Sequence, residues 1–182
     1  MKKLIEQKLY GSVDVTSPKI RELRQKVLDK HQDEVILGKT ITGNQFVARI
    51  NDSYAIDFIF GSQSARFFCE PFTTQLAYDL ASTSNGSAVC AGAHIGGLVI
   101  PIASQADKVL CFEPDPFSFR LLQLNLLLNS VSNVVAREMA LSNVKGLGRL
   151  IGEDASSHFL FSEDNRNGIF CDTLDSIYDD NA

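Results

Sequence analysis

A glycine-bearing turn at residues 89–97 is the segment whose residue types best suit ligand chemistry. It is written VCAGAHIGG and follows a short apolar strand expected at Ala88–Ala91. Glycine lets the backbone approach a ligand closely, and the N-terminus of the following helix offers unpaired N–H groups. We therefore predict that a side chain at Gly92 or Gly96 would obstruct a bound nucleotide. The alternative is a tight strand-to-helix turn that binds nothing, because G-x-x-x-G-G also occurs by chance.

An acidic residue stands where an adenosine-type cofactor would need one. Glu113 lies 21 residues after Gly92, at the end of a second expected strand, Lys108–Phe112. A carboxylate at that place can accept hydrogen bonds from both ribose hydroxyls. The alternative is a solvated carboxylate at a strand end, but the spacing favours a ribose contact.

Strands that alternate with helices must position this turn and this acid. A third strand is expected at Asn133–Arg137, with helices at Leu98–Ser104 and Pro116–Asn129 between the strands. Such alternation is typical of a parallel sheet with right-handed crossovers. Asp115 suits the N-cap of the longer helix and Pro116 its first turn. Residues at helical spacing are expected to face the sheet: Phe117, Leu121, Leu124 and Leu128.

The flanking segments hold smaller elements. After the third strand we predict a hairpin of Gly146–Ile151 with Phe159–Phe161, a strand at Ile169–Cys171 and a final helix capped by Thr173. Before the first strand we predict a helix opening at Ser17-Pro18, a hairpin of Gln45–Ile50 with Ala55–Phe60, and a helix at Thr73–Leu80. The expected domains are an N-terminal α+β appendage at 1–67 and an α/β domain at 68–182.

Four segments occur together in a fixed order: VCAGAHIGG, FEPDPFSFRLLQLNLLLN, NVVAREMALSNVKG and DTLDSI. In that combination the chain resembles the FkbM-type S-adenosylmethionine-dependent methyltransferase family, over roughly residues 68–178. The resemblance implies a Rossmann-like class I methyltransferase fold. It also implies an enzyme that transfers methyl from S-adenosylmethionine, usually to a hydroxyl oxygen of a small-molecule or glycan acceptor.

The same resemblance implies a set of cofactor-binding residues. Glu113 would hold the ribose hydroxyls, Pro114 would lie beside the adenine, and Glu138 and Met139 would lie at the adenine edge. Four residues of the turn would line the methionine and ribose: Gly92, Ala93, His94 and Gly96.

The chain departs from the family in two ways. Cys90 stands where the family usually has an aspartate that positions the methionine end. The chain also ends where the family enters its fourth strand, so we expect a fold that is incomplete at the C-terminus. An alcohol acceptor would need a base within hydrogen-bond reach. The candidates are His94, His158 and Asp154, and we assign the catalytic role to none of them.

Composition gives no support to a nucleic-acid-binding, zinc-binding, secreted or membrane-spanning protein. The net charge of −5 gives no indication of a nucleic-acid partner. The four cysteines lack the spacing of a zinc site, and no metal is expected. No signal peptide or membrane-length apolar stretch is present in the sequence, so a cytoplasmic location is expected.

Two other functions fit the same residues. One is a nucleotide-binding module without catalysis, or a remnant that binds nothing. The other is a fragment of an NAD-binding oxidoreductase, although its usual turn is G-x-G-x-x-G instead of GAHIGG. If the first strand has no neighbour on one side, its open edge should be covered by the N-terminal hairpin or by a second copy, which predicts a homodimer.

Overall fold

The computed structural model divides into two compact units, Met1–Gln75 and Leu76–Ala182. It describes residues 18, 22, 25–26, 29–31, 34–40, 43–52, 55, 71–83, 86–152, 158–161 and 168–179. The division falls within helix α4 (Pro71–Thr83), a few residues after the boundary expected at 67/68. Among the described residues, no helix is long and apolar enough to cross a membrane.

The first unit contains a two-stranded antiparallel sheet. Strand β1 (Val35–Lys39) pairs with β2 (Gln45–Arg49), and Gly43, at a φ of 92°, makes the connecting turn. In the part of the chain that the structure describes, β2 pairs with the preceding strand β1, and the strand predicted at Ala55–Phe60 can be compared only at Ala55. The Asp52 carboxylate accepts the Ala55 N–H at 2.9 Å, and Ala55 is helical instead of extended. Residues 56–60 lie outside the described part of the chain.

The remaining N-terminal expectations agree with what the structure describes. Pro18 is helical, as expected for a helix that opens at Ser17-Pro18, and the described residues up to Lys30 are helical too. Helix α4 contains the predicted Thr73–Leu80. Its large apolar side chains, Leu76 and Leu80, are exposed, whereas Thr74 and Ala81 are buried.

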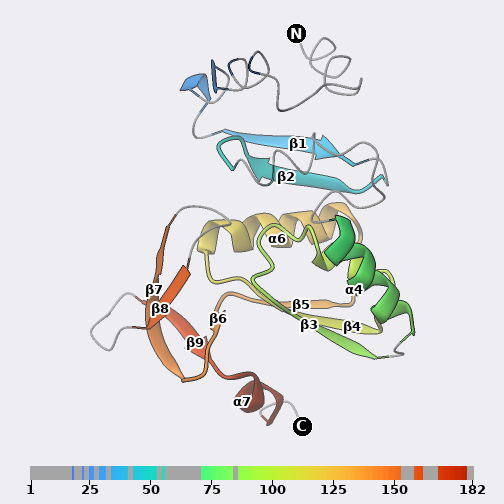
Figure 1. Ribbon diagram of the computed structural model, residues 1–182, viewed down its shortest axis with the longest axis vertical. Coiled ribbons are helices and arrows are strands. Elements are labelled where there is room, and N and C mark those ends of the chain that lie inside the picture. The colour runs from blue at the N-terminus through green and yellow to red at the C-terminus, as the bar shows by residue number, and fades with distance from the viewer. Residues whose placement is uncertain are drawn as a thin grey trace. The chain divides into compact units, whose positions relative to one another are not determined.

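The second unit begins with a parallel βαβαβ arrangement, as predicted (Figure 1). Strands β3 (Ser87–Ala91), β4 (Lys108–Phe112) and β5 (Val134–Arg137) lie in the order β3-β4-β5. Helices α5 (Val99–Ala103) and α6 (Pro116–Leu128) connect them. The fold class is therefore α/β and Rossmann-like, with the first strand next to the second and the second next to the third.

Helix α6 begins as its sequence predicts but presents a different face. Asp115 is the N-cap and accepts the Ser118 N–H at 2.7 Å, with proline at the first helical position. Of the four residues expected to face the sheet, Leu121 is buried and Leu124 is 41% exposed. The buried face instead consists of Ser118, Phe119, Leu121, Leu122, Asn125 and Leu126. Because leucines lie on nearly every side of this helix, their spacing alone did not fix its orientation.

A second, mixed sheet follows. Its strands are β6 (Ala140–Leu141), β9 (Ile169–Asp172), β7 (Gly146–Ile151) and β8 (His158–Phe161), in that spatial order. The predicted hairpin of β7 and β8 is confirmed. Phe159 and Phe161 lie against Gly148 and Gly146, where a Cβ atom would collide with their rings. The two glycines thus leave room for two aromatic rings on that face of the sheet.

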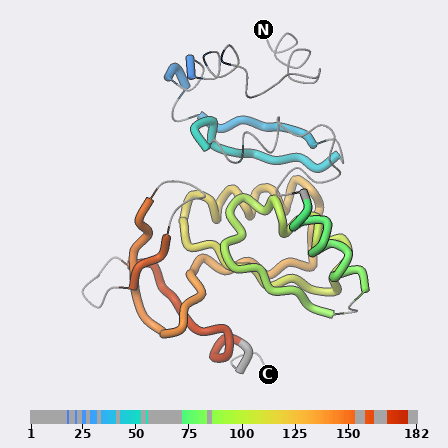
Figure 2. Tube along the Cα trace, in the orientation of Figure 1, coloured from blue at the N-terminus to red at the C-terminus, as the bar shows by residue number. Residues whose placement is uncertain are grey.

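The two faces of the β3-β4-β5 sheet are covered unequally. On one face Val109 and Cys111 are fully buried. On the other, Phe112 packs with Met139 and with Ile177 of helix α7 (Leu174–Asp179). Figures 1 and 2 show α6 and α7 on opposite sides of the three strands. Val89 and Val135 stand in register with Leu110 on the α7 face, and they are 38% and 41% exposed.

This uneven cover predicts self-association. Parallel sheets are almost always covered on both faces, and an unpaired strand edge is a template for pairing. Within the described residues β3 pairs with β4 alone, and β1 and β2 form a sheet of their own. We expect a dimer of twice 20.0 kDa by sedimentation equilibrium at micromolar concentration, and a monomer for Val89→Lys, which places a charge on the edge strand. A monomeric wild-type chain would contradict this expectation.

Candidate functional site

The turn after β3 is held in an unusual backbone conformation. Gly92, His94 and Gly96 all have positive φ, at 73°, 51° and 96°. Only His94 among them has a side chain, and a non-glycine residue in this region is uncommon and strained. The N–H groups of Gly92 and Ala93 both donate to the Phe112 carbonyl at 2.9 Å, which ties the turn to the end of β4.

Glu113 lies next to this turn, as its spacing predicted. Parallel register places Ala91 beside Phe112 and Phe112 beside Arg137, so the carboxyl ends of the three strands meet at one edge. The Glu113 carboxylate accepts the His94 N–H at 2.6 Å and the Asp115 N–H at 2.9 Å, and the residue is only 6% exposed. The alternative of a solvated carboxylate is therefore wrong. Burial raises the pKa of Glu113, while the two N–H donors and the nearby His94 ring lower it and the Asp115 charge raises it.

The two glycines expected to face a nucleotide have different surroundings. A Cβ atom on Gly92 would meet nothing within 4 Å, so the backbone there is open to an approaching ligand. A Cβ atom on Gly96 would lie 3.0 Å from Leu122 and 3.3 Å from Ile100. Gly96 thus allows close packing with helices α5 and α6.

An asparagine of α6 secures the turn from the other side. The Asn125 side-chain amide donates to the Ile95 carbonyl at 2.9 Å, and Asn125 is fully buried. The Asn129 amide donates to the Asn125 carbonyl and remains within its own helix.

The other expected binding residues differ in their accessibility. Pro114 is half-buried and Glu138 is exposed, whereas Ala93 is buried with 3% of its surface exposed. Met139 is buried in the core with Phe112 and Ile177, so its side chain packs in the protein interior. Its backbone N–H and that of Glu113 both donate to the Arg137 carbonyl at 3.0 Å, which keeps the two residues adjacent at the strand ends.

Two cysteines lie below the turn on neighbouring strands. Cys90 of β3 is in register with Cys111 of β4, and both are buried free thiols. Burial, reinforced by the Glu113 charge, raises the pKa of Cys90 to about 11. Burial raises the pKa of Cys111 to about 12, with further contributions from Cys90 and Glu113. At neutral pH both groups are therefore uncharged thiols, which lack the nucleophilicity of a thiolate.

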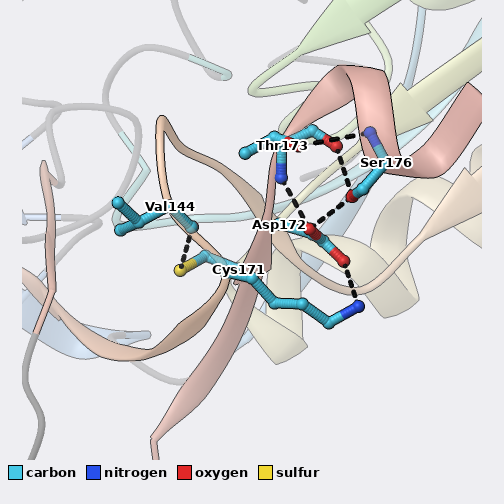
Figure 3. A network of polar contacts seen from close by, with 6 residues as sticks. Val144, Cys171, Asp172, Thr173 and Ser176 are labelled. Atoms are coloured by element: carbon cyan, nitrogen blue, oxygen red, sulfur yellow. Dashed lines mark hydrogen bonds and ion pairs between the residues drawn. The ribbon is translucent and has the colours of Figure 1, made fainter.

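A second polar cluster lies at the start of α7 (Figure 3). Asp172 accepts hydrogen bonds from the Thr173 N–H and the Ser176 hydroxyl, and it pairs with Lys145 at 2.9 Å. The Ser176 hydroxyl and then the Lys145 ammonium hold the pKa of Asp172 below its usual range. The Ser176 N–H donates to Thr173, which confirms Thr173 as the helix cap. This cluster fixes the beginning of helix α7.

The three base candidates lie in different parts of the chain. His158 lies at the start of β8 and is exposed, and Asp154 lies outside the described residues. Of the three base candidates, His94 alone lies in the turn. Among the described residues, no three His, Cys, Asp or Glu side chains gather as a metal site would require.

Comparison with known proteins finds partial likenesses. No family model and no curated protein matches the chain. M. jannaschii TYW2 in complex with AdoMet is 23% identical over 57% of this chain and 42% of its own length, with a TM-score of 0.39. A putative transferase from Pyrococcus horikoshii is 20% identical over 77% of this chain and 50% of its own, with a TM-score of 0.40. A tRNA methyltransferase from M. jannaschii is 15% identical over 63% of this chain and 36% of its own, with a TM-score of 0.43.

The chain therefore spans at most half the length of these three structures. With TM-scores below 0.5, the fold assignment depends on the strand order and parallel register of the chain itself.

The two glycines should respond differently to alanine. Both positions have positive φ, so Gly92→Ala should lower the free energy of unfolding by about 1–2 kcal/mol. Gly96→Ala adds crowding against Leu122 and Ile100, and its loss should be about 2–4 kcal/mol. Urea denaturation measures both. Equal losses would show that packing behind Gly96 contributes nothing.

Replacing Cys90 by aspartate should make stability depend on pH. The new carboxyl would be buried near Glu113, so its folded pKa would lie above the unfolded value of about 3.9. Its contribution to stability would be fully present below that value and lost as pH rises through the folded pKa. Melting temperatures at about pH 5 and about pH 8 should therefore show a larger deficit at the higher pH. Cys90→Ser, which adds no charge, is the control. A loss of melting temperature in Cys90→Asp that is the same at both pH values would contradict burial of the new carboxyl near Glu113.

Proposed function

We propose that the second unit binds S-adenosylmethionine at the carboxyl ends of β3 and β4, and that the chain belongs to a methyltransferase. One observation carries this proposal: the strained turn after β3 is hydrogen-bonded to a buried carboxylate at the end of β4. A turn after the first strand and an acid after the second are the two groups that nucleotide-binding α/β folds use for an adenosine moiety. In such folds the ligand lies at the carboxyl edge of the sheet.

The residues present fit an adenosine-type cofactor. Gly92 leaves open space toward a ligand. A carboxylate has about four acceptor positions, and the two N–H groups occupy two of them. Glu113 can therefore keep both backbone bonds and still accept hydrogen bonds from ribose hydroxyls. Pro114 and Glu138, at the ends of β4 and β5, would border the adenine.

The chemistry asks mainly for binding and orientation from this part of the chain. S-adenosylmethionine supplies an electrophilic methyl group on a positively charged sulfur, and its transfer is an in-line displacement that depends on positioning. The turn would fix the methionine end and Glu113 the ribose, so that the methyl points toward an acceptor. The proposal assigns no base to the acceptor, a small molecule or glycan.

A finer assignment rests on the sequence segments. The four FkbM-type segments run in order through β3, β4–α6, β5–β7 and the start of α7. They support an FkbM-type methyltransferase that acts on a hydroxyl oxygen. Cys90, in place of the family's aspartate, supports the competing function of a nucleotide-binding module with weakened cofactor affinity and no catalysis.

Isothermal titration with S-adenosylmethionine, S-adenosylhomocysteine and NAD, run side by side, distinguishes these functions. We expect binding of the two sulfur compounds and none of NAD. Glu113→Ala should weaken S-adenosylhomocysteine binding by about 1.5–3 kcal/mol, the range for a hydrogen bond to a charged group. Asp107→Ala, an exposed carboxylate at the other end of β4, is the matched control and should bind like wild type.

Preferential binding of NAD would favour an oxidoreductase. Absence of binding by all three compounds would overturn the proposed cofactor site.

A further inference from the structure

The Glu113 carboxylate joins two backbone segments that are distant in sequence. One oxygen accepts the His94 N–H at 2.6 Å and the other accepts the Asp115 N–H at 2.9 Å. His94 belongs to the turn after β3, and Asp115 is the N-cap of α6. With 6% of its surface exposed, Glu113 has little access to water, so these donors are its main compensation for burial.

The turn that it contacts would not adopt this shape without support. Three of its residues have positive φ. At His94, with a φ of 51°, this conformation is strained because the residue has a side chain, which glycine lacks. Such conformations persist only when surrounding contacts determine them. Here the contacts come from consecutive residues of β4: the Phe112 carbonyl accepts two N–H groups of the turn, and the Glu113 carboxylate accepts the third.

We propose that Glu113 is a positioning residue that holds the turn after β3 in its ligand-ready conformation before any ligand binds. We call the two hydrogen bonds that the Glu113 carboxylate accepts from the His94 and Asp115 N–H groups the latch; they form without a cofactor. Its coupling to binding rests on the proposed function, because the same carboxylate would also accept the ribose hydroxyls. Cofactor binding would then increase the order of the turn after β3, and an ordered turn would favour cofactor binding.

The charges around Glu113 give this latch a pH signature. The groups that face it are the His94 ring, the Asp115 carboxylate and the thiols of Cys90 and Cys111. Burial raises the pKa of Glu113 above the ordinary glutamate value of 4.5. The stability that this group contributes is therefore greatest below 4.5 and is lost as pH rises through its folded pKa. Opening of the turn would expose the carboxylate to water and lower its pKa, so acidification should favour the closed turn over the open one.

Amide-resolved hydrogen exchange by NMR on the full, ligand-free chain tests the latch. Protection of the His94 amide, corrected for the intrinsic exchange rate, should fall about tenfold to a hundredfold in Glu113→Ala. Glu113→Gln, which keeps one acceptor oxygen, should fall less. In wild type the same protection should increase as pH falls through the folded pKa of Glu113, and Glu113→Gln should lack this pH dependence.

The matched control is Asp172→Asn, another buried carboxylate in the same unit. It should expose the Thr173 amide and leave His94 unchanged. Unchanged His94 protection in Glu113→Ala, together with a flat wild-type pH profile, would overturn the latch. If either variant fails to fold, the wild-type pH profile still decides. Because no cofactor is present, a protected, pH-sensitive His94 amide would support the latch even if titration showed that S-adenosylhomocysteine does not bind.

Discussion

A carboxylate that is shielded from water must find its hydrogen-bond donors within the protein, and Glu113 finds them on both sides of the sheet edge. The His94 N–H comes from the turn after β3, and the Asp115 N–H comes from the start of α6. The parallel register of β3 and β4 makes this arrangement feasible, since it places the ends of both strands at one edge. The strained backbone at His94 and the start of α6 at Asp115 are thus both bonded to this one side chain.

The layers around the sheet determine what else can happen near that edge. Helices α5 and α6 bury the face that carries Cys90 and Cys111, so these thiols lie under the turn as neutral groups. Asn125 reaches from α6 to the Ile95 carbonyl and Gly96 allows the helices to approach closely. The turn is therefore anchored from below by α6 and from the side by β4, while its Gly92 end stays open. A rigid turn with one open end suits a site that binds and orients a ligand.

Much of this arrangement could be predicted from the sequence because its signals are local. The strand at Lys108–Phe112, the Asp115-Pro116 helix start and the Thr173 cap all follow from adjacent residue types, and the structure confirms them. The spacing of apolar residues did not identify the buried face of α6, because leucines lie on nearly every side of that helix. Local signals also failed at Ala55, which was predicted to begin a strand and is helical in the structure. The spacing of Gly92 and Glu113 predicted their proximity, but only the fold shows that Glu113 binds backbone N–H groups.

The most direct test of the proposed site is an amide NMR titration of the chain with S-adenosylhomocysteine. If the carboxyl edge of β3 and β4 is the cofactor site, the largest shift changes should fall on the amides of Gly92, His94 and Asp115, with Thr173 unaffected. Shift changes confined to other parts of the chain, or none at saturating ligand, would contradict the account.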